Sequence, residues 1–370
     1  MMFSDVTKFL DKMIDLGVPG IDCIVYKSGR EVYRHLAGYS NFEEKIPVSE
    51  NNFYNIYSCT KIVTCVAALQ LYEKGMFKLD DDLSDYMPEF KTMYVKTADG
   101  EVKKANNSIK IIHLFTMTAG LNYESETPSV EEGIKNTNGE CPTREMIKYM
   151  AKEPLEFEPG EGFKYSFCHD VLAGLIEVLT GMTFGEYLNE NIFKPAGMTE
   201  TYFVLPDEYM DRLAEQYRYD PENKKINNIG KEIVRFRLGS KYESGGAGLI
   251  STTEDFIKFL EAVRKYVLIK KETVDLMQTD MLPLDVRENH FNLKIAALGY
   301  SWGLGVRCPK EGSGNTDFGW GGAAGAYYLI DTKNEITCFY VQHMLSSLVN
   351  DDDTEFSKTK LSKMLIEACK

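Results

Sequence analysis

Ser58 and Lys61 lie three positions apart, where a helical pattern begins. A serine hydroxyl is a poor nucleophile at neutral pH, so it needs a neighbouring group that accepts its proton. Side chains at positions i and i+3 lie on the same face of a helix, which would bring the lysine amine beside the serine hydroxyl. The N–H groups at a helix start also favour negative charge nearby. The pair therefore predicts a nucleophile with an activating partner.

The Ser-x-x-Lys spacing also occurs at residues 357–360, so the surroundings must separate the two copies. Residues 62–72, which follow Lys61, are apolar nearly all round and predict a buried helix that ends near Gly75. A lysine in the first turn of a buried helix is costly unless it has a function or a partner. The second copy lies among acidic and basic residues, a pattern typical of a solvated surface. We therefore predict that Ser58 is the reactive serine.

Ser301 is a rival nucleophile, because residues 299–303 match the Gly-x-Ser-x-Gly motif. That motif requires a strand before the serine and a helix after it. Residues 304–308 instead continue as a strand and run into a turn. We therefore interpret Ser301 as a strand residue.

Tyr165 follows a turn that Pro159, Gly160 and Gly162 build, just before an apolar helical pattern. A phenol has a pKa near 10, so it acts as a base only where a nearby cation lowers that value. Lys61 would do so if the two side chains converge. The plain alternative is that Tyr165, one of 22 tyrosines, simply packs.

A glycine-rich stretch, residues 318–328, contains Trp320, Gly321, Gly322 and Ala323. Glycines inside a strand mark a close approach of something to the backbone. A free N–H there, together with the N–H of Ser58, would form an oxyanion hole. A plain bulge or hairpin is the alternative.

We expect no metal and no cofactor. The five histidines are isolated, and neither a Cys/His cluster nor a phosphate loop or dinucleotide fingerprint is present. His169 and Asp170 follow Tyr165 closely, and His169 either lines a cleft or simply starts a helix.

The 370 residues suffice for a large core and for two domains. A net charge of −14 argues against nucleic acid and anionic membrane surfaces as partners. Eight scattered cysteines without Cys-x-x-Cys spacing predict free thiols in a reducing compartment. Neither a signal peptide nor a membrane span is visible, so we expect a cytoplasmic protein that acts on a small molecule. The sequence leaves the oligomeric state open.

Hydrophobic periodicity predicts helices in the middle of the chain and strands at both of its ends. Residues 122–143 are polar and punctuated by Gly and Pro, so we expect a long loop that forms a rim or lid. Thr143 and the Ser251-x-x-Glu254 box are the expected caps of two helices. The predicted helices are residues 5–17, 109–117, 143–152, 170–180, 256–267 and 357–370, and the predicted strands are residues 21–27, 31–36, 298–307, 324–330 and 335–343.

An isolated hairpin is only marginally stable, so we expect the strands of the two chain ends to pair. The predicted fold class is α/β (α+β), an antiparallel sheet flanked by helices with a mostly helical domain inserted. The expected domains are residues 1–57 with 245–370, which form the sheet, and residues 58–244. The cleft between them is the expected site.

These motifs, in this order, resemble the serine β-lactamase and penicillin-binding-protein superfamily. The sequence is most similar to its class C β-lactamase-like branch and to the related family VIII carboxylesterases, and the resemblance implies a β-lactamase/transpeptidase-like fold. It covers most of the chain, in residues 18–20, 53–61, 79–81, 111–121, 159–177, 245–255 and 318–331.

The resemblance implies roles for individual residues. Ser58 would be the nucleophile, Lys61 its activating partner, and Tyr165 the group that passes the proton to the leaving group and helps to activate water. Which of Lys61 and Tyr165 is the primary base stays open. The N–H groups of Ser58 and Ala323 would form the oxyanion hole. The residues expected to contact substrate are Phe167, His169, Trp320, Gly321 and Gly322.

Two departures from the family pattern bear on the substrate. Tyr165-Ser166-Phe167 stands where relatives often carry Tyr-x-Asn, and Trp320 stands where many carry a lysine that faces a substrate carboxylate. Loss of that cation removes a contact worth about 1.5–3 kcal/mol, unless Arg307 or another cation replaces it. The aromatic wall favours a small neutral ester.

We therefore predict a serine hydrolase that is a carboxylesterase. A β-lactamase or D-alanyl-D-alanine carboxypeptidase is the alternative, against which the missing export signal counts. A non-catalytic binding module on the same scaffold is a third reading. The natural substrate is not specified by the sequence.

Overall fold

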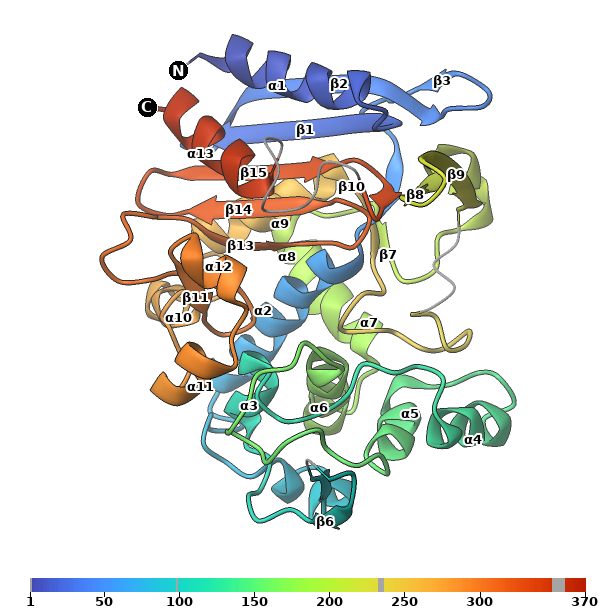
Figure 1. Cartoon of the computed structure of the whole chain (residues 1–370), viewed down its shortest axis with the longest axis vertical. Coiled ribbons are helices and arrows are strands. Elements are labelled where there is room, and N and C mark those ends of the chain that lie inside the picture. The colour runs from blue at the N-terminus through green and yellow to red at the C-terminus, as the bar shows by residue number, and fades with distance from the viewer. Residues whose placement is uncertain (1, 98, 232–235, 348–356) are drawn as a thin grey trace.

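The computed structural model describes residues 2–97, 99–231, 236–347 and 357–370. Its central feature is an eight-stranded antiparallel sheet built from the two ends of the chain (Figure 1). In spatial order its strands are β11 (Tyr300–Trp302), β12 (Arg307–Pro309), β13 (Phe318–Gly321), β14 (Tyr327–Asp331), β15 (Ile336–Val341), β1 (Gly20–Lys27), β2 (Arg30–Asn41) and β3 (Ile46–Pro47).

The pairing of β1 with β15 joins the two chain ends in one sheet. Cys23 pairs with Tyr340 and Val25 with Cys338, and these four side chains are buried. Both strands carry β-branched, aromatic and other apolar residues, which favour a sheet covered on both faces. The predicted fold class, with a sheet formed by both ends, is confirmed. The exact division into two domains stays a prediction.

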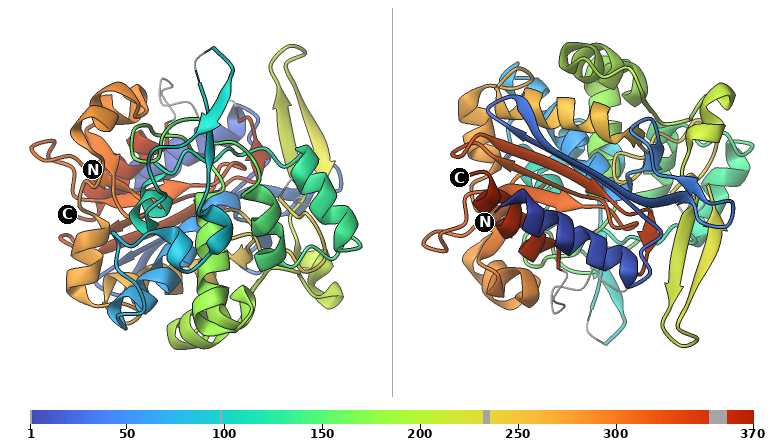
Figure 2. Two further views of the ribbon diagram at one scale, coloured as in Figure 1. Left: turned by 90° about the horizontal axis from the view of Figure 1, so that it is seen from below. Right: turned by 90° about the horizontal axis from the view of Figure 1, so that it is seen from above.

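Helices cover both faces of this sheet. On one face α1 (Phe3–Asp15) and α13 (Lys358–Ala368) lie side by side, and the two termini lie close together (Figures 1 and 2). On the other face α9 (Thr253–Arg264) packs against β1 and β15. Helix α1 buries Val6, Leu10 and Met13 at helical spacing, which is why the amphipathic pattern predicted it.

The inserted residues are mostly helical and centre on α2 (Thr60–Glu73), which lies in the middle of the molecule (Figure 1). Helix α2 is buried nearly all round, as its sequence predicted, and Gly75 follows it with a φ of 70°. The other α-helices are α3 (Ile111–Thr116), α4 (Pro128–Asn136), α5 (Thr143–Met150), α6 (Cys168–Thr180), α7 (Phe184–Leu188), α8 (Lys194–Ala196), α10 (Lys271–Met277), α11 (Leu284–Asn289) and α12 (Leu293–Ala297).

Short turns and small sheets complete the fold. The 3-10 turns are η1 (Tyr57–Cys59), η2 (Leu83–Asp85), η3 (Pro88–Phe90) and η5 (Asp207–Arg212), and η4 (Asn189–Phe193) is a π-helical turn. One small sheet consists of β4 (Phe53–Asn55), β10 (Ile250–Thr252) and β7 (Thr201–Tyr202). A second consists of β16 (Met344–Leu345), β8 (Gln216–Asp220) and β9 (Lys225–Gly230). A third pairs β5 (Tyr94–Lys96) with β6 (Val102–Lys104).

The structure corrects the prediction of a continuous loop over residues 122–143, because α4 lies within it. The Thr127 side chain accepts a hydrogen bond from the Val130 N–H, and Pro128 occupies the first turn. The Gly and Pro residues that suggested a loop therefore include a helix-start signal.

The predicted strand 298–307 is also wrong, because it is split into β11 and the start of β12. Gly305 has a φ of 82°, and the Gly303 N–H donates to the Val306 carbonyl, so the chain turns between the two strands.

Two predicted caps are displaced by one residue. Thr252, rather than Ser251, caps α9, and Thr143 is the first helical residue of α5 rather than its cap.

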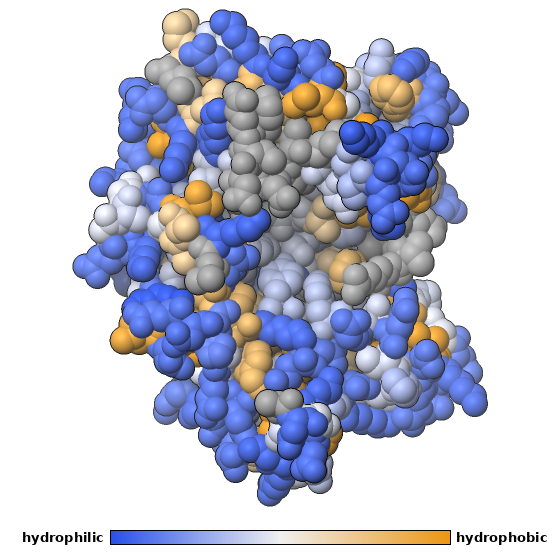
Figure 3. All heavy atoms as spheres, in the orientation of Figure 1, coloured by the Kyte–Doolittle hydropathy of each residue, from blue (hydrophilic) through white to orange (hydrophobic). Residues whose placement is uncertain are grey.

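Hydrophilic side chains cover most of the face in Figure 3, and hydrophobic ones form only small scattered groups. Within the described residues, no single helix is long and apolar enough to cross a membrane. All eight cysteines are free thiols, and seven of them are buried.

Candidate active site

Ser58 lies in the short turn η1, directly before α2, and its backbone is held from two sides. The Ile56 N–H donates to the Leu249 carbonyl at 3.1 Å, and the Tyr57 hydroxyl contacts Gln216 Oε1 at 2.5 Å. Tyr57 itself has a φ of 47°, in the left-handed region that a bulky residue rarely adopts. Such strain persists only where the surroundings enforce it, and it is common beside reacting groups.

Lys61 is completely buried, and its Nζ makes polar contacts with several described groups. It donates to the Gly246 carbonyl at 2.7 Å, to the Tyr123 hydroxyl at 3.3 Å and to Ser58 Oγ at 3.4 Å. The same nitrogen lies 4.5 Å from the centroid of the Tyr165 ring. The structure thus brings Ser58, Lys61 and Tyr165 together, as the sequence predicted, and adds Tyr123.

The Asp170 carboxylate is a buried negative charge close to Lys61. It accepts hydrogen bonds from the Ser244 hydroxyl at 2.7 Å and from the Tyr242 hydroxyl at 3.0 Å. A Cβ atom at Gly246 would lie 2.5 Å from Asp170 Oδ2 and 3.2 Å from Lys61 Nζ, so both groups flank the same glycine. Only a residue without a side chain fits there.

Electrostatics keep Lys61 charged. Burial lowers the pKa of its ammonium group, but the oxygens of Tyr123 and Tyr165 and the Asp170 carboxylate raise it, and the net pKa lies above the usual value. Burial raises the pKa of Tyr123 to about 12, so this phenol stays neutral. Lys61 therefore presents an ammonium group to Ser58 and Tyr165 at neutral pH.

Tyr165 is oriented by Trp320 of strand β13. The Trp320 indole N–H donates to the Tyr165 hydroxyl at 2.9 Å, and the two ring centroids lie 5.7 Å apart. Trp302 packs edge-on against Trp320, with 4.7 Å between their ring centroids. Two elements far apart in the sequence, the turn before α6 and strand β13, thereby hold the phenol in place.

The glycine-rich turn after β13 packs against the backbone just before Ser58. A Cβ atom at Gly322 would lie 2.4 Å from the Ile56 carbonyl oxygen, so only glycine permits this approach. The next residue, Ala323, is exposed, and its N–H donates to no other described residue. That N–H is available to a ligand in the adjoining cavity.

A cavity of about 360 Å³ opens beside these groups. It brings together Ser58, Tyr165 and the four predicted residues of the β13 turn. Its lining residues are Ser58, Tyr123, Tyr165, Phe236, Ile295, Leu298, Tyr300, Arg307, Trp320, Gly321, Gly322, Ala323, Tyr327, Lys358 and Thr359.

Two predicted substrate contacts do not reach this cavity. His169 is wholly buried, and its Nε2 lies 3.6 Å from Cys65 Sγ; burial lowers the pKa of this imidazole far below its usual value. Phe167 is also buried and packs edge-on against Tyr123, with 4.8 Å between their ring centroids. Phe167 directly precedes α6 and His169 lies in its first turn, and neither lines the cavity.

The rival Ser301 is a strand residue, as predicted. It lies in β11, its Oγ donates to Asp280 Oδ1 at 2.7 Å, and it does not line the cavity.

The second Ser-x-x-Lys copy, residues 357–360, was predicted to lie on a solvated surface, and the structure corrects this prediction in part. Ser357 caps α13, accepting from the Lys360 N–H, but Lys358 and Thr359 line the cavity. The local sequence could not have predicted this place in the cavity, because the residues that precede Lys358 are strongly charged and carry no pattern typical of a pocket.

Tyr123 and Asp170 also belong to the site without having been predicted there. The only available signal for Asp170 was its place on the first turn of an apolar helix, where a carboxylate needs a partner.

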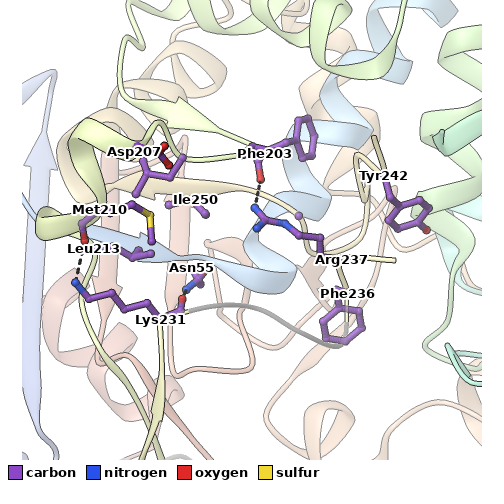
Figure 4. Close-up of a pocket in the computed structure, with 13 residues that line it drawn as sticks. Asn55, Phe203, Asp207, Met210, Leu213, Lys231, Phe236, Arg237, Tyr242 and Ile250 are labelled. Atoms are coloured by element: carbon purple, nitrogen blue, oxygen red, sulfur yellow. Dashed lines mark hydrogen bonds between the residues drawn. The ribbon is translucent and has the colours of Figure 1, made fainter. Parts of the chain in front are cut away.

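A second cavity, of about 220 Å³, adjoins the first at Phe236 (Figure 4). Its two cations are committed to backbone carbonyls, because Arg237 donates to Phe203 O at 2.9 Å and Lys231 donates to Met210 O at 2.8 Å. No nucleophile with an adjacent base lines it among the described residues. The described residues also contain no group of three His, Cys, Asp or Glu side chains able to hold a metal.

Comparisons with known proteins show which family the chain resembles along most of its length. The family model described as Beta-lactamase matches residues 6–358. A lovastatin esterase from Penicillium rubens is 27% identical over 85% of this chain and 86% of its own. Esterase EstB from Burkholderia gladioli is 27% identical over 84% of this chain and 82% of its own. The solved structure of EstCE1, a hydrolase with promiscuous acyltransferase activity, has a TM-score of 0.77 at 23% identity, over 98% of this chain and 97% of its own.

Proposed function

Since the chain belongs to the beta-lactamase family and is a serine hydrolase, we propose that it cleaves small carboxylic esters through an acyl-enzyme formed on Ser58. The observation that carries this proposal is that Ser58 and Tyr165 line one cavity and that the buried Lys61 ammonium group contacts both of them. Its free cysteines support our inference that it works in a reducing compartment.

In the first step Ser58 Oγ attacks the ester carbonyl carbon and gives its proton to the Tyr165 oxygen. Lys61 is an unsuitable acceptor, because its raised pKa keeps it protonated. Its ammonium group and the Trp320 N–H instead stabilise negative charge on the Tyr165 oxygen. We therefore assign the role of base to Tyr165 and the role of electrostatic partner to Lys61.

The carbonyl oxygen becomes an oxyanion as the Ser58–carbon bond forms. We place this oxyanion between the backbone N–H groups of Ser58 and Ala323. Preorganised donors of this kind stabilise a transition state because they are already oriented where charge develops. Collapse of the tetrahedral intermediate breaks the bond to the leaving alkoxide, which takes the proton from Tyr165.

Deacylation repeats these steps with water. Tyr165 accepts a proton from the water, whose oxygen attacks the acyl carbon, and the proton then passes to Ser58 Oγ as the acyl bond breaks. The carboxylic acid leaves and the starting state returns. No metal or cofactor takes part in this proposal.

The walls of the cavity favour an ester over a β-lactam. Trp320, Tyr300 and Tyr327 present aromatic surface. The indole N–H of Trp320, which occupies the motif position of the family lysine, is engaged by Tyr165. A β-lactamase or peptidase activity therefore remains the second candidate, and nitrocefin hydrolysis tests it directly.

A pre-steady-state assay with p-nitrophenyl butyrate tests the proposal. We expect a burst of p-nitrophenol close to one equivalent of enzyme, because acylation precedes slower deacylation. The Ser58→Ala variant should lose the burst and the steady-state turnover, whereas Ser301→Ala should keep both. Undiminished turnover in Ser58→Ala would contradict the proposal, as would an absence of turnover across an ester, lactone and amide panel.

A further inference from the structure

Asn55 is a polar residue on an apolar face of strand β4. Phe53 and Asn55 point to the same side, because successive side chains of a strand alternate between its two faces. Phe53 belongs there to a hydrophobic cluster with Leu205, Leu213 and Ile250. The Asn55 backbone pairs with that of Ile250, and residues directly opposite each other share a face of the sheet. The amide group of Asn55 is therefore held beside apolar neighbours.

The hydrogen bonding of the Asn55 side chain is incomplete, although only 5% of the residue surface is exposed. Its Nδ2 donates to the Lys231 carbonyl at 2.7 Å, which fixes the orientation of the amide. Its Oδ1 is buried and accepts no hydrogen bond from the residues that the structure describes. A buried acceptor without a donor is costly, and most such atoms in proteins have a partner. Oδ1 is therefore an acceptor that a bound molecule can use.

Asn55 lines the second cavity, which has a volume of about 220 Å³ (Figure 4). A cavity of about 150 Å³ can hold benzene, so this one has room for a ring with a short substituent. Much of its wall is apolar, and the lining residues include Phe203, Leu205, Met210, Leu213 and Ile250.

The charged groups of this cavity favour neither an anion nor a cation. Lys231 and Arg237 each donate to a backbone carbonyl, and Asp207 adds a carboxylate to the same lining. An anion would also face the partial negative charge of Asn55 Oδ1, which needs a hydrogen-bond donor. The cavity therefore fits a neutral apolar group with one hydroxyl or N–H donor.

Phe236 connects this cavity with the catalytic one. It lines both cavities, and its ring packs against Tyr123 with 5.3 Å between the ring centroids. Asn55 itself precedes Ser58 by three residues. A group bound in the second cavity therefore lies beside a wall of the catalytic cavity.

We propose that the second cavity binds a neutral apolar group that carries one hydroxyl or N–H donor, and that this donor bonds to Asn55 Oδ1. The group is either the far end of an ester substrate that extends past Phe236 or a separate small molecule, and both present the same chemistry to the cavity. Asn55 is a binding residue in this proposal and takes no part in the reaction at Ser58. The inference goes beyond the proposed function, because binding here does not require ester cleavage.

A titration with benzyl alcohol tests whether the cavity binds such a group. In protein labelled with methyl-¹³C methionine, the Met210 methyl reports on this cavity, because Met210 lines it and does not line the catalytic one. Its resonance is identified by its loss in Met210→Leu. We expect a saturable shift of this resonance and no shift for Met87, which is buried and lines neither cavity. An unmoved Met210 resonance would overturn the inference.

Anisole tests the role of Asn55, because it is an isomer of benzyl alcohol whose oxygen has no hydrogen to donate. The readout is the ratio of the anisole Kd to the benzyl alcohol Kd. Asn55→Leu keeps the size of the side chain but removes the acceptor, so it should lower this ratio by about two- to tenfold. Asn227→Leu, which replaces an exposed amide outside the cavity, should leave the ratio unchanged. An equal ratio in Asn55→Leu would overturn the role of Asn55, and the wild-type titration remains decisive if that variant does not fold.

Two isomeric esters separate the possible sources of the bound group. They are p-nitrophenyl 8-hydroxyoctanoate and p-nitrophenyl 7-methoxyheptanoate. If the far end of the substrate fills the cavity, the hydroxyl ester has the higher kcat/KM in the wild type and loses that advantage in Asn55→Leu. Equal kcat/KM values in both proteins, together with the Met210 shift, would assign the cavity to a separate small molecule. The Met210 shift without turnover of any ester would uphold this site and reject the esterase.

Discussion

The indole N–H of Trp320 donates a hydrogen bond to the phenolic oxygen of Tyr165, with 2.9 Å between the two atoms. This contact joins strand β13 to the turn before α6, and it places a donor beside the oxygen that we propose as the base. Trp320 therefore has two roles in the proposal, as a wall of the cavity and as a partner of Tyr165.

Removing that donor while keeping an aromatic ring should slow the chemical step. We predict that Trp320→Phe lowers kcat for p-nitrophenyl butyrate by about ten- to a hundredfold, because a hydrogen bond to a charged oxygen is worth about 1.5–3 kcal/mol. Steady-state kinetics on both single variants and on Trp320→Phe with Tyr165→Phe measure the coupling. Fully additive losses in kcat would show that the two residues act independently and would contradict the prediction.

Removing the buried ammonium group should abolish most of the acylation. We predict that Lys61→Met lowers the acylation rate by about 10²–10⁴-fold, because the charge that stabilises the Tyr165 oxygen is lost. Stopped-flow detection of the p-nitrophenol burst measures this rate. Lys91→Met, which alters an exposed lysine remote from the cavity, is the control and should acylate normally. A normal burst in Lys61→Met would exclude our role for this residue.

Neutralising Asp170 should move the alkaline limit of activity. The Asp170 carboxylate raises the pKa of Lys61, so Asp170→Asn removes a stabilising negative charge and lowers that pKa. Activity that depends on the ammonium form should then be lost at a lower pH than in the wild type. The pH profile of kcat/KM measures this shift. An alkaline limb that stays in place, or that moves to higher pH, would show that Asp170 does not act through Lys61.

His343 should make the fold sensitive to acid. Burial lowers its pKa to about 3, and neither ring nitrogen has a hydrogen-bond partner among the described residues. An unfolded imidazole titrates near pH 6.5, so below that pH the unfolded state takes up a proton that the folded state does not. The contribution of the neutral His343 imidazole to the free energy of unfolding is therefore complete above about pH 6.5. It is lost progressively as the pH falls toward the folded pKa of about 3.

The variant His343→Asn isolates this effect. Asparagine tolerates the left-handed φ of 37° at this position and does not titrate. Urea unfolding at about pH 7.5 and about pH 5 should show that the wild type loses about 2 kcal/mol more of its free energy of unfolding than the variant does. Equal losses would show that His343 does not control the acid response.

The fold followed from the sequence where hydrophobic patterns were long. Helices α1 and α2 and the pairing of both chain ends were predicted correctly, because periodicity reports directly which face is buried. Short elements were predicted poorly. Helix α4 was hidden among Gly and Pro residues, and Gly305 divides a run of strand-forming residues that reads as one strand.

The residues of the candidate site also divide into those that the sequence predicted and those that it did not. Ser58, Lys61 and Tyr165 were predicted from spacing, context and family resemblance, and the structure brings them together. Lys358 was assigned to a solvated face, because its local sequence is charged, and only the docking of α13 against β13 brings it to the cavity. His169 is the opposite case, since its proximity to Tyr165 in sequence does not bring it to the cavity.

The central claim is that Ser58 carries the acyl group. It is tested most directly by trapping the enzyme with a fluorophosphonate, or with p-nitrophenyl butyrate quenched during the burst, and locating the adduct by peptide mass spectrometry. We predict one adduct per chain, on Ser58, and none in the Ser58→Ala variant. An adduct on Ser301 or Ser357, or ester turnover with Ser58 unmodified, would contradict it.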